Sequence, residues 1–159
     1  LPTNVGNLLL IGGAAINGTG NAMANSMIGS SVNNQLNGGG GNDILNGGAG
    51  NDVLTGGTGY DVFRFTTGGQ ADTITDFDVP TDTIQLENSV FAALTTPGIL
   101  ASDQFRVGTK ALDANDFIVY NKVTGILLYD ADGNGSGAAA RVAIIGADLN
   151  LTNADIVVI

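Results

Sequence analysis

The sequence predicts an all-β chain, with a right-handed parallel β-roll over residues 1–66 and a mainly antiparallel β-rich cap over residues 67–159. Two observations predict this architecture. Nine-residue repeats, each a glycine-rich turn followed by a short strand, fill residues 38–64, and the period is lost after them. Because the end of a repeat stack exposes apolar side chains and unpaired strand edges, we expect the second half to cover it.

Three consecutive nonamers share the pattern G-G-x-G-x-D-x-U-x, where U is a large apolar residue. Their sequences are GGGGNDILN, GGAGNDVLT and GGTGYDVFR, and they run without a break from Gly38 to Arg64. Glycines that tolerate positive φ, together with an Asp, predict a tight turn. The apolar residues Leu45, Leu54 and Phe63 then point inward from very short strands. One nonamer is thus a turn plus a strand, and two nonamers complete one coil.

The charges are those of a protein that binds cations. Fifteen acidic residues face only five basic ones, which gives a net charge of −10 and argues against a nucleic-acid surface. All the acidic residues except Glu87 are Asp, and none precedes Asp43. The chain has no Cys and no His, so disulfides, thiolate zinc sites and the usual hydrolase triads are excluded. We therefore expect no catalytic constellation in this chain.

The repeated aspartates predict calcium sites. Turns 18 residues apart stack on one edge of the coil, so Asp43 and Asp61 face the same gap. Like charges this close repel, unless a cation lies between them and glycine carbonyls complete its shell. Magnesium is less suited, because it needs short octahedral contacts. Asp also favours turns without any metal, but three copies in phase favour calcium.

Upstream, the period continues in a degenerate form over residues 20–37, where Asn takes the place of Asp. We expect Met27 and Leu36 to point inward, together with Ile16, eleven residues before Met27. Turns such as the one containing Asn34 are tied by amide hydrogen bonds or bind calcium weakly.

Downstream, ordinary strand patterns predict strands in TITDF (73–77), TIQL (83–86) and the closing RVAII and IVVI, and a hairpin that joins FIVY (117–120) to ILLY (126–129). We expect a short helical stretch at 89–94. The segment DADGNG (130–135) is similar to the start of an EF-hand loop, but Arg141 stands in place of the closing Glu and strands flank it. A plain hairpin turn is therefore the favoured interpretation.

The three nonamers, ADTITDFD at 71–78, LLYDADGNG at 127–135 and the terminal ADIVVI resemble the C-terminal region of RTX proteins. This family includes serralysin-type metalloproteases, lipases, alginate epimerases and adhesins. The resemblance implies a hemolysin-type β-roll that binds several Ca²⁺ ions and belongs to a larger secreted or cell-surface protein. It also implies export by type I secretion machinery through an uncleaved C-terminal signal, and folding when the chain meets calcium outside the cell. Any catalytic domain would lie upstream of this chain.

The resemblance implies a ligand set as well. One turn supplies two carbonyls and its Asp, and the turn 18 residues on supplies two more carbonyls and its Asp. For the first site these are Gly39, Gly41 and Asp43 with Gly56, Thr58 and Asp61. For the other edge they are Gly48, Gly50 and Asp52 with Asp72, and Gly47, Ala49 and Asp52 with the turn of Asn34. Asp76, just past a strand, is a further candidate ligand.

Three functions remain open at this point. The first is a calcium-dependent folding and secretion module of a larger protein. The second is a self-assembling surface-layer, matrix or adhesin subunit, for which the charge-free first 42 residues are a contact surface. The third is a polysaccharide-binding module, although the chain has few basic residues to hold a polyanion. No apolar run is long enough to span a membrane.

Overall fold

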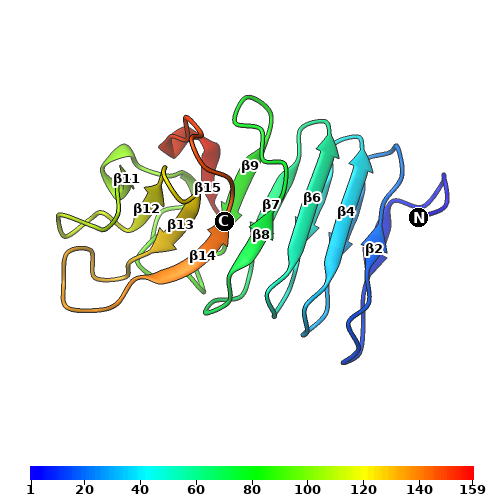
Figure 1. Ribbon diagram of the computed structural model, residues 1–159, viewed down its shortest axis with the longest axis horizontal. Helices are drawn as coiled ribbons and strands as arrows, with labels where there is room; N and C mark the ends of the chain where they lie inside the picture. The colour runs from blue at the N-terminus through cyan, green and yellow to red at the C-terminus, as the bar shows by residue number, and fades with distance from the viewer.

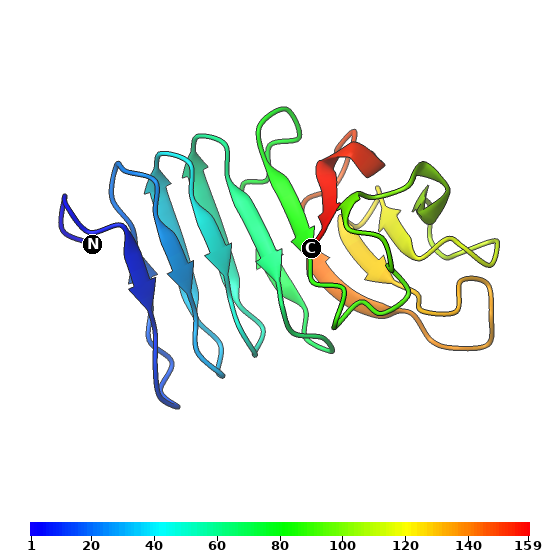
Figure 2. The same cartoon turned by 180° about the vertical axis from the view of Figure 1, so that it is seen from behind.

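Two β-sheets face each other along a stack of coils in the computed structural model, which describes residues 1–159 (Figures 1 and 2). The seven-stranded sheet has the order β1 (Asn7–Leu9), β3 (Ser26–Ile28), β5 (Ile44–Asn46), β7 (Val62–Phe65), β9 (Thr83–Leu86), β15 (Ile156–Val158), β10 (Gly98–Ile99). The eight-stranded sheet has the order β11 (Phe105–Val107), β12 (Ile118–Asn121), β13 (Ile126–Tyr129), β14 (Ala140–Ile144), β8 (Asp72–Ile74), β6 (Val53–Thr58), β4 (Gln35–Gly40), β2 (Gly18–Thr19).

Residues 18 positions apart pair in parallel between neighbouring coils, as the nonamers predict. Met27 pairs with Leu45 and Leu45 with Phe63 in one sheet, and Leu36 pairs with Leu54 in the other. All five of these side chains are fully buried between the sheets. The alternation of turn and short strand therefore produces the predicted parallel β-roll, with one large apolar residue per nonamer in the core.

The first coil differs from the expectation at Ile16, which is 42% exposed. Gly18 occupies the inward position instead, because it pairs with Leu36. Any side chain at Gly18 would collide with those of Leu8 and Met27, which fill the space. The prediction for Ile16 was wrong because a glycine left no apolar signal at the position that the register requires.

The parallel pairing continues past residue 66. Strand β8 pairs with β6, and β9 pairs with β7, although two or three extra residues lengthen each intervening turn: Val53 pairs with Thr73 and Val62 with Thr83. Strands β14 and β15 then add in parallel to β8 and β9. Both sheets therefore run from the roll into the cap, and the division of the chain at 66/67 stays a prediction.

The cap mixes parallel and antiparallel pairs. Strands β12 and β13 form the expected hairpin, β14 is antiparallel to β13, and β11 is parallel to β12.

The expected helix at 89–94 was wrong. Two N–H groups bond to the carbonyl of Glu87, and the chain then continues as turns that bury Phe91 and Leu94. The helices present are two short 3₁₀ segments, η1 (Ser102–Gln104) and η2 (Asn153–Asp155). No helix has the length and apolarity needed to cross a membrane.

Burial in the core of the roll predicts which side-chain truncations destabilise the protein. Leu54 is fully buried between the sheets, so Leu54→Ala should lower the free energy of unfolding by about 2–5 kcal/mol. Urea unfolding in saturating calcium measures this loss. Val123→Ala is the control, because Val123 is 82% exposed and its truncation should change little. Equal stability of the two variants would contradict the assigned core.

Candidate metal centre

Buried aspartates form a hydrogen-bonded ladder along each edge of the roll. On one edge, Oδ1 of Asp43 accepts the N–H of Asn25 at 2.8 Å, Oδ1 of Asp61 accepts that of Asp43 at 2.8 Å, and Oδ1 of Asp82 accepts that of Asp61 at 3.1 Å. On the other edge, Oδ1 of Asp52 accepts the N–H of Asn34 at 2.7 Å, and Oδ1 of Asp72 accepts that of Asp52 at 2.9 Å. Each coil is thus tied to the next by a carboxylate.

The second carboxylate oxygen distinguishes three of these aspartates. Oδ2 of Asp43, Asp52 and Asp61 is buried and has no hydrogen-bond partner. In each case it lies against the first glycine of its own nonamer, where a Cβ would collide with it. Whole-residue exposure is at most 1%. A buried carboxylate without a partner is costly, so these turns require a proton or a cation.

Burial raises the pKa of every aspartate in the two ladders. The pKa of Asp61 rises to about 6, chiefly through burial and in part through neighbouring carboxylates, and that of Asp72 rises to about 7, chiefly through burial. The pKa values of Asp43, Asp52 and Asp82 also rise, for the same main reason. With these carboxylates ionised and no cation bound, the folded ladder is therefore destabilised near neutral pH.

The upstream turns are closed by their own amides. Oδ1 of Asn34 accepts the N–H of Ser30 at 2.7 Å, four residues earlier, and Nδ2 donates to the carbonyl of Ile16. Asn25 closes its turn in the same way, through the N–H of Asn21 at 2.8 Å. These contacts match the amide-bonded alternative for the early turns. They leave Asn34 less free to bind a metal, and its role as a ligand stays a prediction.

Asp82 belongs to the ladder and was missed in the sequence. The signal was available, since Asp82-Thr83-Ile84 repeats the Asp-x-apolar core of Asp61-Val62-Phe63 without the glycines. Its Oδ2 accepts the N–H of Asp78 at 2.9 Å, so it closes its own turn as the asparagines do. This carboxylate ends the ladder with both oxygens hydrogen-bonded.

Asp76 lies beside the third nonamer and holds its backbone. Its two carboxylate oxygens accept the N–H groups of Gly56 at 2.9 Å and Gly57 at 2.8 Å. It is close enough to Asp61 to contribute to the raised pKa of that residue. This geometry makes Asp76 a clamp for the glycine turn, and coordination of a metal by it stays a prediction.

Backbone carbonyls point into the gap between the stacked turns. The carbonyls of Gly39 and Gly41 face Gly57 and Gly59 of the next coil, and that of Gly56 faces back towards the preceding coil. A Cβ on Gly57 or Gly59 would collide with the carbonyl it faces, and both have positive φ, at 98° and 140°. The glycines of the motif are thus required by close packing of carbonyls as well as by turn geometry.

The remaining predicted carbonyl ligands have varied surroundings. The carbonyl of Thr58 accepts the N–H of Gly41 at 2.9 Å. On the other edge, the carbonyl of Gly47 faces the preceding coil and that of Gly48 accepts the hydroxyl of Thr67. Ala49 donates its N–H to the carbonyl of Ser30 at 3.1 Å, across the same gap. A carbonyl has two lone pairs, so these bonds leave capacity for a cation.

This donor set suits a hard cation. No three acidic side chains converge at one point, so each gap offers carboxylates from stacked turns and several carbonyls. Calcium takes six to eight oxygens in flexible geometry and accepts such a mixture. The buried unpartnered Oδ2 atoms supply the charge that the cation would neutralise. The residues present fit calcium.

Comparison with known proteins agrees with this geometry. Residues 28–63 match the family model of the RTX calcium-binding nonapeptide repeat, in four copies. Among solved structures, the chain is similar to the solution structure of the AlgE6R3 subunit from the Azotobacter vinelandii mannuronan C5-epimerase. The TM-score is 0.55 at 22% identity, and the match covers 91% of this chain and 80% of that one. No curated protein sequence matches.

The raised pKa values predict a pH dependence in chelator. Asp61 and Asp72 have pKa values of about 6 and about 7 when folded, above the ordinary 3.8, so the folded chain binds more protons than the unfolded chain between these limits. Stability without calcium should therefore fall as the pH rises from about 4 to about 8. Circular dichroism of the chain in EDTA across this range measures it.

Calcium should reverse this trend, because protons then compete with the cation for the same oxygens. A chain whose folded fraction in EDTA rises with pH would show that the buried carboxylates do not carry these shifts.

Proposed function

Because residues 28–63 match the RTX calcium-binding nonapeptide repeat and the chain folds as a β-roll, we propose that calcium binding drives its folding outside the cell and that it serves the secretion and stability of a larger extracellular protein. RTX repeats are typical of extracellular proteins. The single observation that carries the proposal is that Asp43 and Asp61 on one edge of the roll, and Asp52 on the other, each have a buried carboxylate oxygen that lacks a partner.

The coupling follows from opposing free energies. Ordering the backbone costs about 1–2 kcal/mol per residue, and glycine loses the most freedom. In the nonamers this cost falls on turns that also bury anions. Where calcium is scarce, as inside a cell, hydrogen bonds and apolar packing do not offset these terms, and the chain stays open for export. Outside the cell, calcium binds only the folded form and shifts the equilibrium by mass action.

The ligands in this proposal are those of the stacked turns. One calcium binds between the turns of Asp43 and Asp61, with the carbonyls of Gly39, Gly41 and Gly56. On the other edge, calcium binds between the turns of Asp52 and Asp72. The raised pKa of Asp72 supports a role there, because its carboxylate also gains from a cation. Asp52 and the turn of Asn34 make a weaker site, since the Asn oxygen already closes its own turn.

The C-terminal segment supports export before folding. The terminal Ile156–Val158 strand is β15, which pairs with β9 and buries Ile156 and Val158. If this segment is the type I secretion signal, the export machinery must meet it before it enters the sheet. A chain that folds only in extracellular calcium satisfies this requirement. Activity of the parent protein would then lie in a catalytic domain upstream.

Calcium titration followed by far-UV circular dichroism tests the coupling. The chain should pass cooperatively from coil to β-structure in calcium, revert in chelator, and respond little to magnesium. Asp61→Asn should raise the calcium concentration at the midpoint by about tenfold or more, because it removes a charged ligand.

Asp148→Asn is the matched control for charge. Asp148 is exposed and has φ of 59°, which Asn tolerates well. Its midpoint should equal that of the unaltered chain. A chain that is fully folded in chelator at neutral pH would overturn the coupled mechanism.

A second candidate function is polysaccharide binding, supported by the outer face of the eight-stranded sheet. A shallow groove there is lined mostly by polar uncharged side chains, namely Asn17, Thr19, Gln35, Asn37 and Thr55. Amides and hydroxyls on a flat face suit the hydroxyls of a sugar chain. The structurally similar AlgE6R3 is a subunit of a mannuronan epimerase, so mannuronan is the first polysaccharide to test.

Isothermal titration with mannuronan oligomers in calcium measures this binding. The double variant Gln35→Ala, Asn37→Ala should weaken it about tenfold, since it removes two or more hydrogen bonds. Val123→Ala, far from the groove in the sequence, should leave it unchanged. If the unaltered chain gives no heat of binding, this candidate function is excluded, and the proposed role as a folding module is unaffected.

A further inference from the structure

The loop between β13 and β14 carries oxygen ligands that the roll does not use. Its sequence, DADGNGSG over 130–137, places Asp at the first and third positions, Asn at the fifth and Gly at the sixth. This is the spacing with which oxygen-rich calcium loops begin. It lies in the cap, between strands of the eight-stranded sheet, and is separate from the nonamers.

Asp130 is buried without a partner. It is 7% exposed, and its Oδ1 atom is buried and accepts no hydrogen bond. Asp132, two residues further along the same loop, adds a second carboxylate. A buried carboxylate oxygen without a partner is costly, so Asp130 requires a proton or a cation.

No basic side chain neutralises this pair. The ion pair of the cap joins Arg106 to Asp116 at 3.8 Å and involves neither of the two aspartates. Lys110 lines the same surface cavity as Asp130, a hollow of about 330 Å³, but its ammonium forms no ion pair or hydrogen bond.

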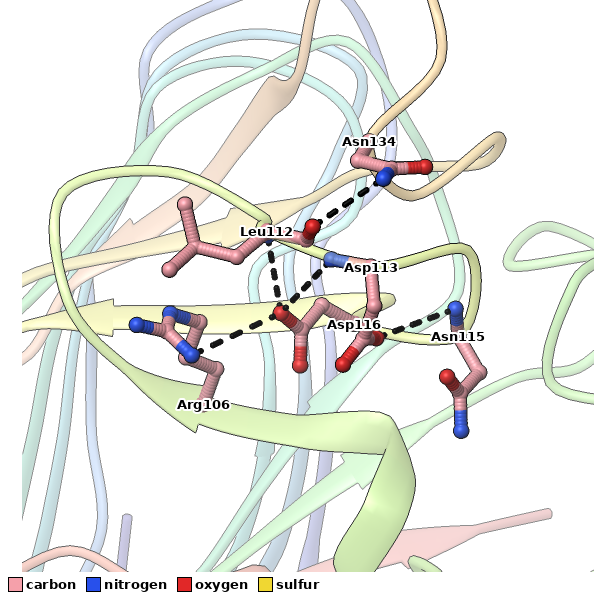
Figure 3. Close-up of polar contacts among 6 residues, drawn as sticks. All are labelled: Arg106, Leu112, Asp113, Asn115, Asp116 and Asn134. Carbon is pink, nitrogen blue, oxygen red and sulfur yellow. Dashed lines mark hydrogen bonds and ion pairs between the residues drawn. The ribbon is translucent and has the colours of Figure 1, made fainter.

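The loop is held in place by contacts that leave these oxygens free. Asn134 donates its N–H to the carbonyl of Asp113 at 2.8 Å and its Nδ2 to that of Leu112 at 3.0 Å, as Figure 3 shows for the side chain. Asp116 fixes that segment by accepting the N–H groups of Leu112 and Asp113. Because Nδ2 of Asn134 is committed, its Oδ1 remains available.

Backbone geometry holds the loop from its other side. Gly133 has φ of 60°, and a Cβ there would collide with the backbone of residues 113–114. Gly137 donates its N–H to Oδ2 of Asp132 at 2.9 Å, which orients this carboxylate. The ligands are therefore positioned by the cap itself.

We propose that this loop is a calcium site of the cap, distinct from the sites of the roll, with Asp130, Asp132 and the amide oxygen of Asn134 as side-chain ligands. Backbone carbonyls of the loop and water complete the shell. Two carboxylates on an open loop predict a weak site, with a dissociation constant of about 10⁻⁴ to 10⁻³ M. Such a site is filled outside the cell and empty inside it.

Heteronuclear NMR of the full chain tests the site, with the amides of Gly133, Gly135 and Gly137 as reporters. Calcium added after the roll transition is complete should shift these amides in a second saturable step, and magnesium should not. Asp130→Asn should abolish that step and reduce the bound calcium by one ion per chain. If Asp130→Asn fails to fold, Asp132→Asn provides the same test, because Asp132 is exposed.

Two further variants distinguish a calcium site from a loop neutralised by Lys110. Asp148→Asn should keep both the second step and the ion count. Lys110→Met should tighten calcium binding, because it removes a positive charge from the cavity; a loss of stability in chelator with no change in calcium binding would make Lys110 the counter-ion and overturn the proposal. Because the reporters lie in the cap, a roll that is already folded without calcium would overturn the coupled folding and still leave this result readable.

Discussion

The structure depends on one interaction, a buried carboxylate that accepts a backbone N–H from the preceding coil. In Asp43, Asp52 and Asp61 this bond uses Oδ1 and leaves Oδ2 buried against glycine. The same side chain therefore ties two coils together and opposes their closure by its own charge. Apolar packing between the sheets is present in every coil, whereas this charge must be neutralised before the coils can close.

Asparagine and aspartate serve the same position in two ways. Asn34 closes its turn with an N–H four residues earlier, and Asp82, at the far end of the ladder, does the same. The central aspartates lack this bond. On the edge of Asp43 and Asp61, the order along the roll is therefore a neutral, self-closed turn, then charged turns without this bond, then the self-closed turn of Asp82. The requirement for a cation is thus concentrated in the middle of the stack, where a cation has coils on both sides.

The nine-residue period predicted the coil, its register and its inward residues, because each nonamer carries its own turn and its own apolar side chain. The prediction failed where a residue that does not match the nonamer pattern occupies the structural position. Gly18 takes the inward position that Ile16 was expected to hold, and Asp82 continues the ladder after the glycines have gone. The helix expected at 89–94 is a set of turns, because burial of Phe91 and Leu94 decides the path of so short a segment.

The cap is built on the roll. Strand β14 pairs with β8 and β15 pairs with β9, each in parallel, so the last coil supplies the edges on which the cap assembles. Parallel pairing over such separations is entropically unfavourable until the template strand is fixed. In β8 that template begins at Asp72, whose carboxylate belongs to the ladder. If calcium neutralises the ladder as we propose, it also fixes β8, and through β8 the cap would depend on the same cations as the nonamers.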